Sequence, residues 1–169
     1  MAKSFENRDG WIWMNGEFIP WKNATSHIIS QGMHYASAVF EGERSYNGII
    51  FKSEEHTERF FKSAEIIGIE IPFTKDDITS AKNELIKKMN FKDCYVRPLA
   101  WRGGEQMGIS TTNSNINVAI ALWDDWASYF KIEDRKAGLK LITSPWKRPA
   151  PDTAPHQAKA SGPYIICTM

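Results

Sequence analysis

Alternation of apolar and polar residues opens the chain and predicts β-structure. One Asn-Gly pair, at 15–16, lies within an apolar stretch that covers residues 11–20. A second pair, at 47–48, lies within a stretch that covers residues 40–52. Asn-Gly supplies the two positive-φ residues that a type I′ hairpin turn requires. The pattern therefore predicts two β-hairpins and, with them, an antiparallel sheet.

The apolar period then changes from two residues to three or four, which is typical of helices. Ser53 is suited to cap a first helix, whose apolar face contains Phe60 and Ala64 and whose stop signal is Gly68. Acidic residues near position 74 favour the start of a second helix, over residues 74–89. Two helices are therefore expected after the hairpins.

Three further segments are rich in β-branched or apolar residues and predict strands: 94–101, 115–122 and 139–143. The order of hairpins, then helices, then more strands is an α+β pattern rather than an alternating βαβ one. We therefore expect the fold class α+β, with an antiparallel sheet and two helices.

The segment 123–136 mixes aromatic and charged residues and is interpreted as a domain connection. We expect an N-terminal α+β domain over residues 1–130. Residues 131–169 are expected to form a linker and the beginning of a second, β-rich domain. An apolar run that begins at Tyr164 stops at Met169, and this predicts a truncated chain.

Composition narrows the class of protein. Hydrophobic residues make up 42% and charged residues 24%, which excludes disorder. A net charge of +1 gives no overall positive field, so no nucleic-acid partner is expected. The sequence has no secretory signal and no long apolar run, so we expect a cytoplasmic protein without a membrane partner. Cys94, Cys167 and the scattered histidines lack metal-ligand spacing, and no metal is expected.

The segment before the end of the chain is unusual. Prolines crowd into residues 145–163 and predict an irregular, extended path. Small residues on both sides of Lys159 leave room for a ligand beside that lysine. Nothing else distinguishes Lys159 from the other lysines. Taken alone, the residues support a soluble α+β domain of unknown activity.

Several motifs carry a resemblance to a known family. The sequence HYASAVFEG at 34–42 is very similar to the HY-x-x-x-V-F-E-G segment of branched-chain amino acid aminotransferases. Further matches follow in the family's order: H-x-x-R at 56–59, YVRP at 95–98, MG at 107–108, WASY at 126–129 and KASGPY at 159–164. The chain therefore resembles the N-terminal half of this family through its catalytic lysine. Ser161 and Pro163 depart from the family, which commonly has glycine and asparagine at these positions.

These aminotransferases belong to the class IV, or fold type IV, enzymes, which use pyridoxal 5′-phosphate. D-amino acid aminotransferase and aminodeoxychorismate lyase are relatives that usually carry G-D-G in the corresponding segment. The F-E-G and Y-V-R-P sequences of this chain favour the branched-chain branch. Both relatives stay open as alternatives, as does a truncated, inactive domain that dimerises through its sheet.

The resemblance implies a cofactor site. Lys159 would form a Schiff base with pyridoxal 5′-phosphate and then move a proton during transfer of the amino group to 2-oxoglutarate. Arg59 would bind the cofactor phosphate, and Tyr164 would donate to the cofactor's 3′-oxygen. The alternatives are a solvated lysine, a helix-surface ion pair of Arg59 with Glu55, and a core tyrosine.

The resemblance also implies a substrate site for leucine, isoleucine or valine, built from Tyr35, Phe40, Gly42, Tyr95, Arg97, Trp126 and Tyr129. The aromatic residues at 40, 126 and 129 would form the apolar walls, and core packing is the alternative for Phe40 and Trp126. Tyr35, reaching over from a partner subunit, and Arg97 would receive the distal carboxylate of glutamate or 2-oxoglutarate. Tyr95 would receive the α-carboxylate.

A homodimer or a higher homo-oligomer is the assembly that the resemblance implies. The family's chains are about twice as long, in the range of two-domain enzymes. The carboxylate that pairs with the cofactor's ring nitrogen, and most of the phosphate site, would therefore lie beyond Met169.

Overall fold

The computed structural model describes residues 4–125, 136–138 and 140–168. The segment 126–135, which holds Trp126, Tyr129 and the expected domain boundary at 130, lies outside them. The elements are β1 (Trp11–Met14), β2 (Glu17–Pro20), the 3-10 helix η1 (Trp21–Asn23), α1 (Gln31–His34), β3 (Ala38–Phe40), β4 (Glu43–Tyr46), β5 (Ile49–Ile50), α2 (Ser53–Ile66), α3 (Lys75–Met89), β6 (Cys94–Arg102), β7 (Ile116–Trp123) and the 3-10 helix η3 (Gly162–Cys167).

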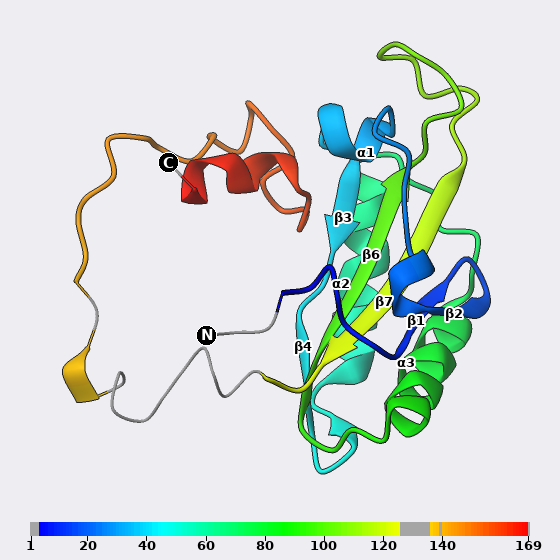
Figure 1. The fold of residues 1–169 in the computed structure, drawn as a ribbon. Helices are drawn as coiled ribbons and strands as arrows, with labels where there is room; N and C mark the ends of the chain where they lie inside the picture. Colours follow the sequence, from blue (N-terminus) through cyan, green and yellow to red (C-terminus); the bar gives the residue numbers. More distant parts are fainter. Residues whose placement is uncertain (1–3, 126–135, 139, 169) are drawn as a thin grey trace.

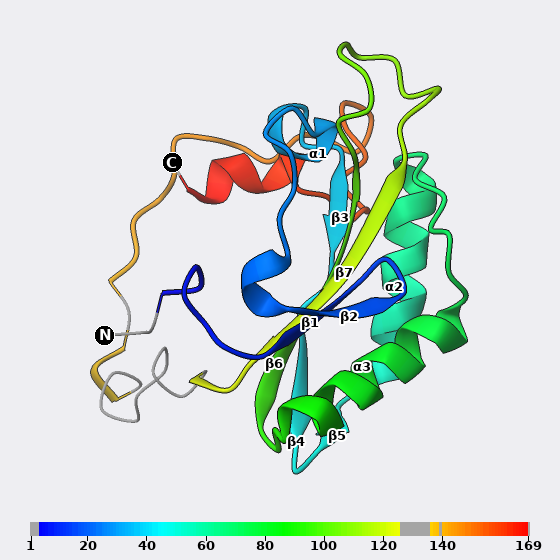
Figure 2. The ribbon, with the colours of Figure 1, turned by 45° about the vertical axis from the view of Figure 1, so that its right-hand side comes forward.

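The strands form one seven-stranded antiparallel sheet in the order β2-β1-β7-β6-β4-β5, with β3 also paired to β6. Figure 1 shows α2 and α3 behind the sheet, and the turned view of Figure 2 brings both helices out on one side of it. The expected α+β class with an antiparallel sheet is confirmed.

The hydrophobic core lies between the sheet and the two helices. Val96 of β6 and Ile120 of β7 are completely buried there, together with Phe60 of α2 and Leu85 of α3. Burial of each large apolar side chain contributes about 1.5–3 kcal/mol. Because side chains alternate along a strand, the residues between these core positions point to the opposite face of the sheet. That open face, away from α2 and α3, carries the candidate site.

Both Asn-Gly hairpins are confirmed. Asn15 and Asn47 each have a φ of 52°, and a positive-φ glycine follows each of them. They join β1 to β2 and β4 to β5 in antiparallel register. The local turn chemistry therefore determined these two connections.

The expected strand over 40–46 is instead divided into β3 and β4. Its register opposite β6 continues unchanged across the division. The N–H of Glu41 still donates to the carbonyl of Pro98 at 2.9 Å, but a proline has no N–H to donate in return. The missing bond interrupts the ladder, and Glu41 and Gly42 lie at the interruption.

The helices begin close to the expected positions. Thr74 caps α3 in a capping box with Asp77, as the acidic residues there indicate. The prediction that Ser53 caps the first helix is wrong, because the cap position is occupied by Lys52 with a φ of 55°. Lys52 makes no side-chain cap bond, and Ser53 is the first helical residue. The helix after the second hairpin therefore begins one residue earlier than a cap at Ser53 would imply.

The expected strand over 139–143 is also wrong for the residues that the structure describes there. Residues 140–143 form no strand, and Leu141 and Ile142 are 85% and 93% exposed. No described strand lies beside them to supply a hydrogen-bonded partner, and a single strand is not stable alone. The chain returns to the sheet at Ala160, which bridges Val39 of β3 in antiparallel fashion.

The segment 158–168 therefore lies along the β3 side of the sheet, where Figure 1 shows it in orange and red. This return brings residues more than a hundred positions apart in the sequence together at β3. None of the described helices has the length and apolar character needed to cross a membrane.

Candidate active site

Lys159 is held by its backbone at the edge of the sheet. Its N–H donates to Ser63 Oγ of α2 at 2.9 Å, and its carbonyl accepts from the Phe40 N–H at 3.1 Å. The alanines on either side of it are buried in the core. Because neighbouring side chains of an extended segment point in opposite directions, the Lys159 side chain points away from that core.

The Lys159 amine lies against two aromatic rings. Its Nζ donates to Tyr164 Oη at 2.8 Å and lies 4.8 Å from the centre of the Phe40 ring. The two rings are 4.9 Å apart. In the part of the chain that the structure describes, no carboxylate pairs with this amine. An amine without an acidic partner is suited, once it loses its proton, to attack a carbonyl group.

Arg97 of β6 places a second cation beside the same ring. Its guanidinium carbon lies 4.8 Å from the centre of the Phe40 ring, and Nη2 donates to Tyr95 Oη at 2.9 Å. Its Nε is buried and has no hydrogen-bond partner among the described residues. A buried guanidinium donor without a partner costs free energy, so this position fits an anionic ligand. Lys159 and Arg97 therefore lie on one aromatic surface.

Gly42 is required for the position of Tyr95. A Cβ added at Gly42 would overlap the Tyr95 hydroxyl. The Tyr95 ring is also fixed from its other side, since it stacks on Trp123 with centroids 4.6 Å apart. Gly42 thus acts by allowing the close approach of the tyrosine that contacts Arg97.

Trp123 is a site neighbour that the motifs did not reveal. It lies at the end of β7, and its ring centre is 5.9 Å from the Arg97 guanidinium. Strand alternation was the available signal, because Trp123 follows Ala121 by two residues on the open face. The predicted strand stopped one residue short of it.

Arg59 of α2 is paired with Glu41. Its Nε donates to Glu41 Oε1 at 2.6 Å and its Nη2 to Oε2 at 2.7 Å. The alternative ion pair of Arg59 with Glu55 is wrong, because Glu55 pairs with Lys52 instead. The Arg59 side chain is 53% exposed, whereas that of Glu41 is fully buried. Because Glu41 lies outside α2, the spacing of residues along that helix could not predict its pairing with Arg59.

The remaining expected site residues are not at this surface or not described. Tyr35, at the end of α1, is 45% exposed and packs on the ring of His34, at 4.1 Å. Within the described part of the chain it makes no hydrogen bond or ring contact with Lys159 or Arg97. The expected contribution of Tyr35 from a partner subunit therefore stays a prediction. Trp126 and Tyr129 lie outside the described residues.

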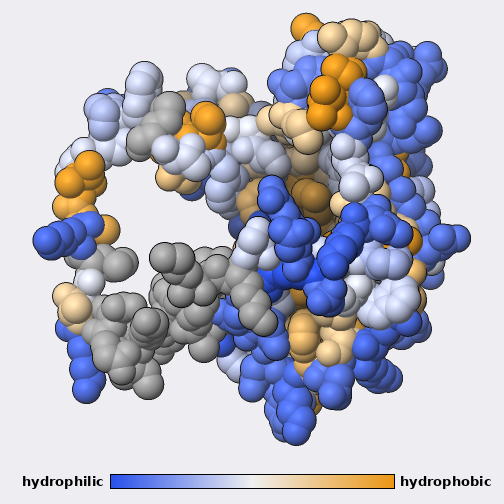
Figure 3. All heavy atoms as spheres, viewed as in Figure 1, coloured by the Kyte–Doolittle hydropathy of each residue, from blue (hydrophilic) through white to orange (hydrophobic). Residues whose placement is uncertain are grey.

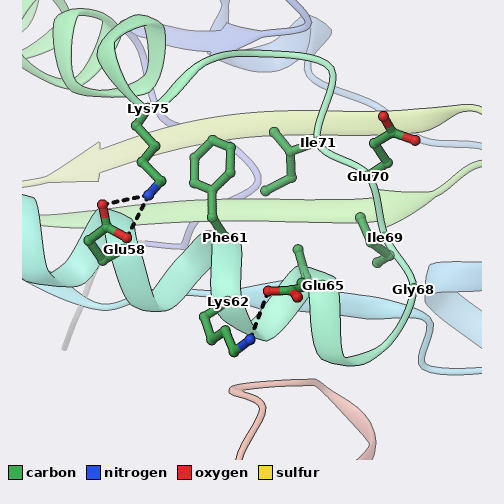
Figure 4. A pocket seen from close by; sticks show the side chains of 10 residues that line it. Glu58, Phe61, Lys62, Glu65, Gly68, Ile69, Glu70, Ile71 and Lys75 are labelled. Atoms are coloured by element: carbon green, nitrogen blue, oxygen red, sulfur yellow. Dashed lines mark hydrogen bonds and ion pairs between the residues drawn. The ribbon is translucent and has the colours of Figure 1, made fainter.

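Two of the pockets on the described residues differ in their chemistry. One cavity of about 520 Å³ lies between α2 and the loop before α3, where ion pairs of Lys75 with Glu58 and of Lys62 with Glu65 flank the apolar Phe61 (Figure 4). It contains none of the described site residues. The other, of about 400 Å³, is on the open face of the sheet and is lined by Arg97, apolar side chains and several hydroxyl residues that include Ser161. The Arg97 Nε, which has no hydrogen-bond partner among the described residues, makes the second cavity the stronger ligand site.

These features define a class of protein: an α+β domain that presents a lysine, a tyrosine and an arginine around one phenylalanine, at the edge of an open sheet. Residues 38–169 match the family model described as amino-transferase class IV. The chain belongs to this family, and the resemblance read from its motifs is confirmed.

Individual relatives agree with the family model. The chain is 41% identical over 164 residues to a probable branched-chain-amino-acid aminotransferase of Rickettsia bellii, covering 97% of this chain and 55% of the relative. It is 36% identical over 166 residues to the branched-chain-amino-acid aminotransferase of Pseudomonas aeruginosa, covering 96% and 54%. The chain therefore spans about half the length of these relatives.

Solved structures share the fold. The branched-chain amino acid aminotransferase of T.th. with pyridoxamine 5′-phosphate matches with a TM-score of 0.87 and 36% identity, covering 95% of this chain and 54% of that one. The Escherichia coli enzyme matches with a TM-score of 0.87 and 33% identity, with the same coverage. The fold of this chain therefore matches about half of each of these enzymes.

Proposed function

We propose that the complete protein is a pyridoxal 5′-phosphate-dependent aminotransferase that transfers the amino group of leucine, isoleucine or valine to 2-oxoglutarate. The observation that carries the proposal is the arrangement of Lys159, Tyr164 and Arg97 around the Phe40 ring. The names of the relatives support it, as does the pyridoxamine 5′-phosphate in the T.th. structure.

The residues present fit this cofactor. Pyridoxal phosphate, when bound, supplies an aldehyde and a ring that withdraws electrons from the α-carbon of an amino acid. Lys159 has an amine without an acidic partner among the described residues, which suits covalent attachment and then proton transfer at Nζ. Tyr164 Oη, 2.8 Å from that amine, is a hydrogen-bond donor for the ring oxygen. Arg59 has an exposed guanidinium for the phosphate.

The substrate pocket must accept an apolar side chain in one half-reaction and a second carboxylate in the other. Phe40 offers an apolar wall, and Arg97 beside it offers a cation with an unpartnered donor. Tyr95, fixed by Gly42, would receive the α-carboxylate. The Phe40 ring also covers one side of the Lys159 amine, from which its centre is 4.8 Å away.

Assembly with a second copy of the chain belongs to the same proposal. Tyr35, Met33, Met107 and Ile109 are exposed on α1 and on the connection between β6 and β7. Figure 3 shows apolar side chains at this end of the sheet, at the upper right. Exposed apolar groups gathered at one end suit an interface. A homodimer or higher homo-oligomer would bring Tyr35 to a partner's site.

Domain division and location complete the proposal. We place an N-terminal domain over residues 1–130 and the beginning of a second domain over 131–169. The exposure of Leu141 and Ile142 supports a segment whose packing partners belong to another domain. A cytoplasmic location suits the two free cysteines, Cys94 and Cys167.

The proposed function is tested with the complete protein, pyridoxal 5′-phosphate, L-leucine and 2-oxoglutarate. We expect formation of glutamate and of the 2-oxo acid of leucine, with no turnover in a reaction that lacks 2-oxoglutarate. Chromatography of both products measures the transfer. Reaction of D-alanine but not of L-leucine would contradict the branched-chain assignment and favour another member of class IV.

A further inference from the structure

Glu41 is a fully buried carboxylate in contact with the candidate site. It accepts hydrogen bonds from Arg59 through both oxygens, from His56 Nδ1 at 2.8 Å and from the N–H of Gly42 at 3.2 Å. Burial raises the pKa of the Glu41 carboxyl, but the hydrogen bonds from Arg59 and His56 outweigh it and hold the pKa below its ordinary value of 4.5. Glu41 is therefore a carboxylate at neutral pH.

The position of this carboxylate is fixed relative to the Phe40 ring. Glu41 follows Phe40 directly in the chain, and its N–H is bound to the carbonyl of Pro98. His56 and Arg59 are one helical turn apart on α2 and share its oxygens. Glu41 thus ties the helix that carries Arg59 to the strand end that carries the ring beside Lys159.

The geometry leaves part of Arg59 available. Glu41 takes the Nε and Nη2 donors, so Nη1 has no hydrogen-bond partner among the described residues, and the side chain is half-exposed. The neighbouring acid Glu43 gives a contrast. It pairs with Lys82, and both side chains are completely buried, so that pair is closed to any ligand. The Glu41 pair, by contrast, holds a cation whose side chain is half-exposed to solvent.

We infer that Glu41 is a positioning residue for anion binding: it fixes the Arg59 guanidinium so that its Nη1 edge meets the phosphate of the cofactor. This rests on the proposed function, in which Arg59 binds that phosphate. An exposed arginine otherwise loses side-chain entropy when it binds a ligand, and an anchored one has lost it already. The opposite reading is that Glu41 merely neutralises Arg59. Its removal would then tighten anion binding, so the two readings predict opposite signs.

The test is a cycle of variants in the complete protein. The dissociation constant of pyridoxal 5′-phosphate is measured by fluorescence titration for the wild type, Glu41→Gln, Arg59→Ala and the double variant. We expect Glu41→Gln to weaken binding roughly three- to tenfold, as loss of one ordered side chain implies. In the Arg59→Ala background the same substitution should change the dissociation constant less than about twofold. Glu41 is inferred to act through Arg59, so its effect is lost when Arg59 is absent.

Lys62→Ala is the matched control, since it removes an exposed helix cation one turn beyond Arg59 that pairs with Glu65. It should leave the dissociation constant unchanged. Should Glu41→Gln fail to fold, Glu41→Asp keeps the buried charge but withdraws it by one carbon, and it should weaken binding in the same direction.

Tighter or unchanged binding in Glu41→Gln would overturn the inference, as would an equal loss in the Arg59→Ala background. A wild type that binds no cofactor would instead contradict the proposed function, and this inference with it. If Arg59→Ala leaves the constant unchanged while the cofactor still binds, the role of Arg59 is wrong and Glu41 has nothing to position. The outcomes therefore separate the two proposals.

Discussion

Replacement of Lys159 by alanine is expected to abolish amino transfer in the complete protein. The amine that would hold the cofactor and carry the proton is removed, and loss of proton transfer alone lowers a rate roughly 10²- to 10⁴-fold. The fold should persist, because Lys159 is held through its backbone and its side chain points away from the core. Steady-state formation of glutamate from leucine and 2-oxoglutarate measures the effect.

Lys147→Ala is the control for that variant, since Lys147 is an exposed lysine of the same proline-rich segment. It should keep the wild-type rate. A Lys159→Ala protein that transfers amino groups at more than about a tenth of the wild-type rate would refute the assignment of this lysine. Addition of a small amine such as methylamine should restore part of the lost proton transfer, because a free amine can take over that role.

Replacement of Arg97 by leucine is expected to damage one half-reaction much more than the other. Only 2-oxoglutarate and glutamate present a second carboxylate, and the Arg97 guanidinium beside Phe40 is the cation offered to it. A hydrogen bond to a charged group contributes about 1.5–3 kcal/mol. Its loss corresponds to roughly ten- to hundredfold in kcat/KM for 2-oxoglutarate. Stopped-flow measurement of each half-reaction would show the difference.

The leucine half-reaction of the same variant serves as its internal control and should change less than about threefold. Equal losses in both half-reactions would mean that Arg97 is structural or binds the α-carboxylate. Arg97→Lys is a second variant that keeps the charge without the fork of donors, and it should recover only part of the loss. A melting temperature close to that of the wild type would confirm that the pocket, and not the fold, was changed.

The parts of the fold that were predictable are those set by local chemistry. Asn-Gly turns determine the two hairpins, and the capping box at Thr74 determines the start of α3. The interruption after Phe40 was not predictable from its own segment, because its cause is Pro98 on a strand almost sixty residues later. The strand expected over 139–143 failed for a related reason. A strand needs a partner, and apolar residues alone do not show whether one is present.

The site was predictable only through family motifs. Nothing in the local sequence places Lys159 beside Phe40, and the contact depends on the bridge between Val39 and Ala160. Glu41 lay inside a recognised motif, but its partner Arg59 could not be read from helix spacing, which suggested Glu55 instead. Trp123 could have been found from strand alternation. The partners of Tyr35 depend on an assembly that a single sequence does not display.

Whether Lys159 is the residue that holds the cofactor can be measured directly. The complete protein is loaded with pyridoxal 5′-phosphate, reduced with sodium borohydride and mapped by peptide mass spectrometry. Reduction makes the bond between an amine and the cofactor permanent, so the added mass stays on the lysine concerned. We predict the added mass on the peptide that contains Lys159 and on no other. Its appearance on another lysine, with the Lys159 peptide unmodified, would mean that Lys159 does not hold the cofactor.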